Sequence, residues 1–234
     1  MHSLQARHEN DKEADRFPMK TKTAMQGWKR AMRFILERGE PQKTISQREY
    51  FEFANLIVDV EDVETDIDEI FMELSRLPIS YPTAEELKRF ILNKTAIPGF
   101  SYTYGKRIFA YSSQAINQID EFIIPLLKEN PSSKRAIVTL WEPQKDAKAY
   151  KKDTPSFIFM QFRLRNGKIH ASAVTRSMDF LYGWPSHLYQ VMILQEYVKE
   201  HLPIPLELGP IATITTNAVL FREHEGIIRK IITE

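Results

Sequence analysis

The stretch DTPSFIFMQFRLRNGKIHASAV, residues 153–174, holds two runs of apolar and β-branched side chains on either side of Asn166-Gly167. An Asn-Gly pair between two such runs is the strongest short-range signal for a two-residue β-hairpin, because both turn residues tolerate a positive φ. The pattern therefore predicts strands at 156–165 and 168–174.

Helical periods lie on both sides of this hairpin. Apolar spacing predicts helices at 25–36, ending at Gly39, and from Thr83 to Leu92, where Thr83 and Glu86 form a capping box. Further helices are predicted at 117–130 and 187–201. The first of these has one apolar face, formed by Ile119, Phe122, Ile123, Leu126 and Leu127.

Three more segments are rich in β-forming residues. The segments 135–141 and 211–221 are predicted strands, whereas 50–60 fits either a strand or a buried helix. Helices around a mostly antiparallel sheet give the α+β class. Residues 1–20 are polar without an apolar period and are expected to be a flexible arm, so that 21–234 form a single domain.

Composition limits the classes of function. Lys+Arg 32 against Asp+Glu 31 leaves a formal charge of +1, so no global field recruits nucleic acid or a membrane, and any anion site must be local. The absence of cysteine excludes disulfides and thiolate chemistry. The carboxylate-rich segment 59–68 lacks the glycine of a calcium loop, so no metal is expected. Without a long apolar run, the expected compartment is the cytoplasm.

Four stretches in order carry a family resemblance: YTYGKR at 102–107, NPSSKRAIV at 130–138, DTPSFIFMQF at 153–162 and RSMDFLYGWP at 176–185. A weaker fifth is TNAVLF at 216–221. Together they resemble the thymidylate synthase and pyrimidine nucleotide hydroxymethylase superfamily. The resemblance implies a thymidylate synthase-like fold and a homodimer formed through the sheet.

The resemblance also implies a reaction and its partners. In that superfamily a cysteine thiolate adds to C6 of a pyrimidine nucleoside monophosphate, and C5 then takes a one-carbon unit from methylenetetrahydrofolate. Arg176 and Ser177 match phosphate-binding residues of the same subunit, and Lys134 and Arg135 match a pair that reaches into the partner's site. Arginine suits this role because its fork matches phosphate oxygens. Without the resemblance, these arginines would be read as surface salt bridges.

Ser156 stands where the family has its nucleophilic cysteine. A serine hydroxyl is far more basic than a thiol and needs a dedicated base, which no motif places beside it. Three explanations stay open. In the first, the natural protein has cysteine at this position and serine is a substitution. In the second, the natural residue is serine and only holds a ligand. In the third, Ser156 is an activated nucleophile in altered chemistry.

The resemblance assigns nine further residues to positions of the family's site. Asp179 matches the carboxylate near the pyrimidine and folate, and Glu86 matches the glutamate that organises proton-transfer water, although capping already explains it. His187, Gln161 and Phe221 fall at positions for the base and sugar. His187 replaces an asparagine, and Val219 and Phe221 replace a histidine and a tyrosine. Trp141, Trp184 and Gly183 match the folate pocket, although buried tryptophans are as often core residues.

The sequence thus favours a C5 one-carbon transferase of pyrimidine nucleotides. The alternatives are an inactive homologue that binds a nucleotide or a partner protein, and an enzyme that acts without covalent attack at C6.

Overall fold

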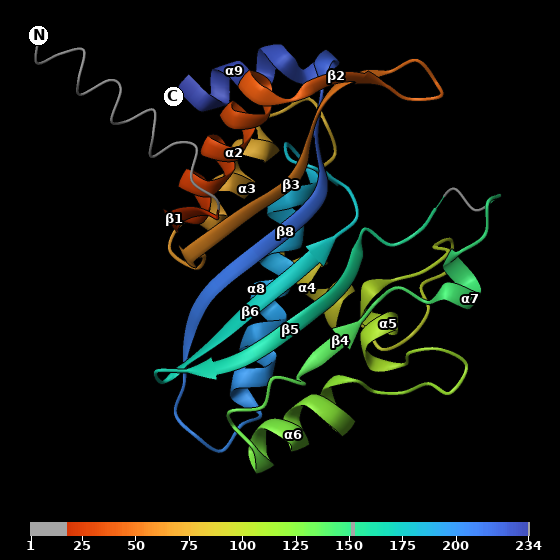
Figure 1. The fold of residues 1–234 in the computed structure, drawn as a ribbon, viewed down its shortest axis with the longest axis vertical. Coiled ribbons are helices and arrows are strands. Elements are labelled where there is room, and N and C mark those ends of the chain that lie inside the picture. The colour runs from red at the N-terminus through yellow and green to blue at the C-terminus, as the bar shows by residue number, and fades with distance from the viewer. Residues whose placement is uncertain (1–17, 151–152, 234) are drawn as a thin grey trace, which may run out of the picture.

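A computed structural model describes residues 18–150 and 153–233, and its centre is a mixed sheet of eight strands (Figure 1). Six strands follow the order β1-β3-β8-β6-β5-β4, while β2 pairs with β3 and β7 with β8. The strands are β1 (Met19–Thr23), β2 (Glu40–Lys43), β3 (Glu49–Asp62), β4 (Ile137–Thr139), β5 (Phe157–Arg165), β6 (Lys168–Thr175), β7 (Met178–Asp179) and β8 (Glu207–Phe221).

The hairpin predicted from Asn166-Gly167 is present between β5 and β6, with φ of 52° and 72° at the two turn residues. The segment 50–60 is the strand alternative, β3. The sheet is less antiparallel than predicted, because β1–β3, β6–β8 and β7–β8 are parallel pairs. The central β6–β8 pair is parallel because a long helix, α8 (Gly183–Glu200), returns the chain between them.

The helices begin and end largely where local signals place them. α2 (Ala24–Arg38) starts at the Thr23 cap and stops at Gly39, and α4 (Ala84–Leu92) carries the complete Thr83–Glu86 capping box. The remaining helices are α3 (Ile67–Ser75), α5 (Tyr104–Phe109), α6 (Ile124–Glu129), α7 (Pro143–Asp146) and α9 (Glu225–Thr233), with a 3₁₀ turn at Arg222–His224.

The predicted helix at 117–130 differs from its expected geometry. Its first part, Ile119–Ile123, is a π-helical turn, and α6 follows it directly. A π turn holds more residues than an α turn and rotates the following side chains around the axis. Phe122 is therefore 41% exposed, whereas Ile124, which was not assigned to the apolar face, is buried.

The N-terminal boundary also differs from the prediction. Residues 1–17 of the predicted flexible arm lie outside the described part. Met19 and Lys20, however, belong to β1 and pair with Val58 and Asp59 of β3. Met19 is 1% exposed, so its buried side chain ties this strand to the core of the domain.

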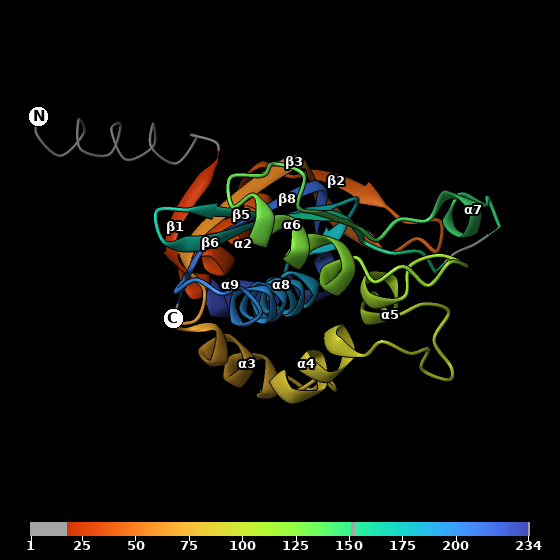
Figure 2. The same ribbon diagram turned by 90° about the horizontal axis from the view of Figure 1, so that it is seen from below.

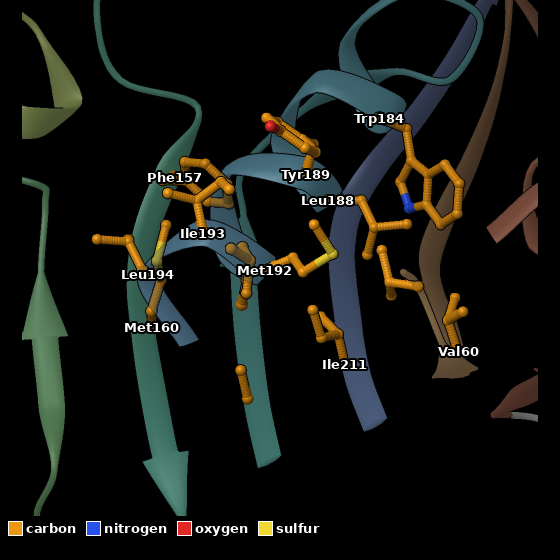
Figure 3. Close-up of a cluster of buried hydrophobic side chains, with 14 of the residues drawn as sticks. Val60, Phe157, Met160, Trp184, Leu188, Tyr189, Met192, Ile193, Leu194 and Ile211 are labelled. Atoms are coloured by element: carbon orange, nitrogen blue, oxygen red, sulfur yellow. The ribbon is translucent and has the colours of Figure 1, made fainter. Parts of the chain in front are cut away.

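The helices α2, α3, α4, α8 and α9 lie on one side of the sheet (Figure 2). The core lies between α8 and the sheet, where Trp184, Leu188 and Met192 pack against strand residues such as Val60 and Ile211 (Figure 3). Trp184 is fully buried and its indole N–H donates to Thr213 Oγ1 at 3.0 Å. This packing fixes the first turn of α8 against the sheet.

The opposite face of the sheet carries a half-buried apolar row. The strand register aligns Ile57 of β3 with Ile214 of β8, Val174 of β6 and Phe159 of β5. We call this row the open face. Among the described residues, no helix is long and apolar enough to cross a membrane.

Candidate functional site

Four segments meet at one end of the sheet and bring the principal predicted site residues together. The antiparallel register places Phe157 opposite Thr175, and the Arg176 N–H donates to the carbonyl of Ser156 at 2.9 Å. β7 follows at once and pairs Asp179 with Val219. Ser156, Arg176, Ser177 and Asp179 therefore lie around a common end of β5, β6 and β8.

Arg176 is held in place by the loop that precedes Ser156. Its Nε donates to the Pro155 carbonyl at 2.9 Å, and its Nη2 donates to the Thr154 carbonyl at 3.0 Å. In the part of the chain that the structure describes, no carboxylate forms an ion pair with this guanidinium. Neutral carbonyl groups therefore hold the guanidinium in place, and no carboxylate of the described residues neutralises its positive charge.

The Tyr104 hydroxyl links Ser156 to His187. The Ser156 N–H donates to Tyr104 Oη at 3.3 Å, and Tyr104 Oη lies 3.1 Å from His187 Nε2. His187 Nδ1 is 2.7 Å from the Gly183 carbonyl, which can only accept. The proton of the neutral imidazole is therefore assigned to Nδ1, and Nε2 accepts from the Tyr104 O–H.

The surroundings of His187 keep its ring neutral. The ring centroid lies 4.5 Å from that of Phe157 and 5.5 Å from that of Tyr104. Desolvation lowers the pKa of His187 to about 4, and the hydrogen bond to Gly183 opposes this change. Both ring nitrogens already have protein partners, so contact with a pyrimidine base requires that one of these hydrogen bonds be released.

Asp179 lies in β7, paired with Val219 of β8, at the same end of the sheet. Its Oδ1 accepts from the Leu181 N–H at 2.9 Å. Burial raises the pKa of Asp179, while backbone N–H groups and the charges of His224 and Arg48 act in the opposite direction. A carboxyl with a raised pKa holds a proton more readily, which suits proton exchange with a bound ring.

Arg48 and Tyr104 were both missed by the sequence reasoning. Arg48 comes from the loop between β2 and β3, stacks 3.9 Å over the ring of Phe221 and pairs with Glu223 at 2.6 Å. No sequence signal connects positions 48 and 221. Tyr104 lies inside the quoted YTYGKR stretch and could have been selected from it.

Three predicted residues are not brought to Ser156 within this chain. Lys134 and Arg135 are exposed on the segment before β4. Gln161 lies farther along β5, where its side-chain amide donates to the Lys134 carbonyl at 2.7 Å. The assignment of Gln161 to the base or sugar is therefore not supported by its position. Lys134 and Gln161 instead line a cationic hollow of about 310 Å³ with Arg163, Arg165 and His170.

Comparison with known proteins places these residues in a family. The family model described as "Thymidylate synthase" matches residues 93–234. The chain belongs to the thymidylate synthase family. A "Putative thymidylate synthase" of Methanosarcina barkeri is 29% identical over 228 residues, covering 93% of this chain and 97% of that protein. The Methanosarcina mazei relative of the same description is 29% identical over 218 residues, covering 92% and 94%. A "Thymidylate synthase" of Bacillus atrophaeus is 31% identical over 102 residues, covering 43% of each chain.

The glutamate matched to proton transfer in thymidylate synthases is committed to capping here. Glu86 Oε2 accepts from the Thr83 N–H at 2.9 Å and from the Thr83 hydroxyl at 3.0 Å. The side chain is exposed, and these hydrogen bonds lower the pKa of Glu86. It is thus an anionic capping group, and its position gives no support to a catalytic role.

Two of the residues matched to the folate pocket of thymidylate synthases, Trp184 and Gly183, are packed within the domain. Trp184 is a core residue, because its ring stacks on Phe180 and its N–H is used by Thr213. Gly183 packs close to Met178, whose sulfur lies 3.0 Å from the position of a Cβ at this glycine. Trp141 is half-buried beside the start of β5. The packing of Trp184 and Gly183 gives no support to a folate contact at these two residues.

The described residues, 18–150 and 153–233, contain no group of three or more histidine, aspartate or glutamate side chains arranged to hold a metal ion.

Proposed function

We propose that this protein binds a pyrimidine nucleoside monophosphate at the end of the sheet where Ser156, Arg176, Ser177 and Asp179 meet. The observation that carries the proposal is the state of Arg176. Two backbone carbonyls orient its guanidinium, and no carboxylate of residues 18–150 or 153–233 forms an ion pair with it. A preorganised, uncompensated arginine is a suitable anchor for a phosphate dianion.

A homodimer formed through the open face would complete this site. The apolar row Ile57, Ile214, Val174 and Phe159 offers a surface for a second copy, and such C2 contacts are the commonest form of homo-oligomer. Lys134 and Arg135 are exposed and are not brought to Ser156 within their own chain. Their exposure supports a role in the phosphate site of a second copy.

Calorimetry with dUMP, dCMP, UMP and CMP tests the nucleotide site. We expect at least one nucleotide to bind, and Arg176→Ala to weaken it roughly tenfold to hundredfold, the range for a lost hydrogen bond to a charged group. The matched control is Arg76→Ala, which removes an exposed arginine at the end of α3 and should leave affinity unchanged. No binding by any of the four nucleotides overturns the proposal.

C5 one-carbon transfer is the second candidate function. The position of Tyr104 favours it, because its hydroxyl contacts the Ser156 backbone N–H and His187 Nε2 and therefore lies beside the residue that replaces the family's nucleophile. Serine remains a poor nucleophile without a stronger base. The geometry therefore supports nucleotide binding better than turnover.

Ser156→Cys separates these two functions. A thiol has a pKa near 8.5 and is far easier to ionise than a serine hydroxyl. We expect tritium release from C5-labelled dUMP to be slow for the parent and faster for Ser156→Cys, with Ser172→Cys on β6 as the control thiol. If Ser156→Cys binds dUMP but releases no more tritium than the parent, the scaffold does not support attack at C6.

A further inference from the structure

The cationic hollow lies at the hairpin end of β5 and β6, beside the segment that leads into β4 (Figure 1). Its volume is about 310 Å³. The polar side chains that line it are those of Ser132, Ser133, Lys134, Gln161, Arg163, Arg165 and His170. Gln161, Arg163 and Arg165 occupy alternate positions of β5, so they lie on the same face of the sheet.

The positive charges of the hollow have no carboxylate beside them. Within residues 18–150 and 153–233, no aspartate or glutamate lines the hollow, and neither Arg163 nor Arg165 forms an ion pair. Lys168 of the same hairpin differs, because its Nζ pairs with Glu207 at 3.1 Å and its side chain does not line the hollow. A concave surface with charge of one sign concentrates the electric field and attracts the opposite ion. The hollow is therefore suited to an anion.

His170 lies within the positive field of the two arginines. The strand register places it directly opposite Arg163. Burial lowers the pKa of His170, and the charges of Arg163 and Arg165 lower it further. The charge of Asp59 on β3 acts in the opposite direction, but Asp59 does not line the hollow. The imidazole of His170 is thus a natural reporter of any negative charge that enters.

The hydrogen-bonding groups of the hollow are mainly donors. Ser133 is 6% exposed, and its Oγ accepts from the Arg135 N–H at 3.3 Å, while its own hydroxyl proton has no acceptor among the described residues. Phosphate oxygens accept hydrogen bonds, and the fork of arginine matches their geometry. Arg163 and Arg165 offer two such forks on one face of β5, which suits two phosphate groups joined together.

We propose that the cationic hollow binds a diphosphate group, free or esterified, through Arg163, Arg165 and Ser133. The site is separate from the phosphate anchor at Arg176, which follows the opposite end of β6, and it does not depend on nucleotide binding there. The hollow shares a face of the sheet with the apolar row but lies beyond Phe159, towards the hairpin turn. A second copy seated on that row has to leave the hollow open.

Calorimetry of the full chain with inorganic diphosphate, at constant ionic strength, tests the proposal. Diphosphate should bind about tenfold more tightly than inorganic phosphate, because it engages both arginines. Arg163→Gln and Arg165→Gln should each weaken diphosphate binding by about tenfold or more. Lys168→Gln is the matched control, since it removes a cation of the same hairpin that already has a carboxylate partner, and it should leave the affinity unchanged.

Two further arms separate this site from the nucleotide site. Arg176→Ala should bind diphosphate as tightly as the parent, and Arg163→Gln should bind dUMP as tightly as the parent. Failure of the nucleotide proposal and failure of this one are therefore distinguishable. Uridine diphosphate, added to Arg176→Ala, compares esterified with free diphosphate in the absence of the nucleotide anchor. We expect the two to bind equally, because the lining is mainly polar.

NMR titration of the histidine rings gives a second readout that does not depend on a variant. Saturating diphosphate should raise the pKa of His170, because a nearby anion favours the charged imidazolium, and should leave His201 at the exposed end of α8 unchanged. Four results would overturn the proposal. These are no binding of diphosphate by the parent, an equal loss in Arg163→Gln and Lys168→Gln, loss of diphosphate binding in Arg176→Ala, and an unchanged pKa of His170.

Discussion

Tyr104 connects the backbone of Ser156 with the side chain of His187, two residues that depart from the family pattern at separate positions. Its hydroxyl accepts from the Ser156 N–H and donates to His187 Nε2. Burial raises the pKa of Tyr104, so this hydroxyl keeps its proton near neutral pH. The backbone of Ser156 and the ring of His187 are therefore held by one hydroxyl, so a change at His187 should alter the position of Tyr104 beside Ser156.

Neutral His187 predicts a pH dependence of stability. Its pKa is about 4 in the folded chain against 6.5 as the ordinary value, so the unfolded chain binds the extra proton between these limits. Stability should therefore fall as the pH drops from about 6.5 to 4, by at most about 3 kcal/mol. Urea unfolding at a series of pH values measures this loss.

His187→Asn removes the titrating ring and should flatten the stability curve between these pH values. His201→Asn, at the exposed end of α8, is the matched control and should keep the slope of the parent. An unchanged slope in His187→Asn would show that other groups cause the acid sensitivity.

Two variants at the start of α4 distinguish a capping role of Glu86 from a catalytic role. Thr83→Ala removes the two hydrogen bonds of the Thr83 hydroxyl, to the Glu86 N–H and to the Glu86 carboxylate, and should lower the free energy of unfolding by about 1 kcal/mol. Glu86→Gln preserves a capping side chain, so it should change stability by less than about 0.5 kcal/mol.

Glu86→Gln should also leave dUMP affinity and tritium release from Ser156→Cys unchanged. Urea unfolding and the tritium assay measure the two effects. A large drop in tritium release with normal stability would instead assign Glu86 to proton transfer.

Elements with local signals were predictable from the sequence. The Asn166-Gly167 turn and the Thr83–Glu86 box each need only a few adjacent residues. The π turn at Ile119–Ile123 was not predictable, because its apolar spacing is also compatible with an α-helix. The parallel β6–β8 pair was missed for a different reason. It joins segments separated by a complete helix, and no local pattern specifies their relative direction.

The sequence likewise lacks local signals for some of the contacts that form the site. The family resemblance assigns Ser156, Arg176 and Asp179 to one site, and the strand register brings their segments to one end of the sheet, while their roles stay a prediction. It did not predict that Trp184 would be a core residue, since a tryptophan's burial depends on the partner strands. Arg48 reaches Phe221 through tertiary packing alone.

At the scale of the whole molecule, the apolar open face predicts a homodimer. One charged side chain placed in this face should dissociate it. Val174→Lys places an ammonium in the centre of the apolar row, where a second copy would bury it. Sedimentation should show a dimer for the parent and a monomer for the variant, with weaker dUMP binding. Ile204→Lys adds the same charge to an exposed loop and should stay dimeric. A monomeric parent would contradict the prediction.

The most direct test of a nucleotide site shared between two copies is complementation. Arg176→Ala and Arg135→Ala should each bind dUMP poorly, because one lacks the phosphate arginine of its own chain and the other lacks the one from its partner. After the two variants are mixed and refolded together, half of the dimers should be mixed, each with one intact site. Calorimetry should then recover about a quarter of the parent's sites at the parent's affinity. If mixing restores no binding although each variant folds and dimerises, the nucleotide site is not built from both copies.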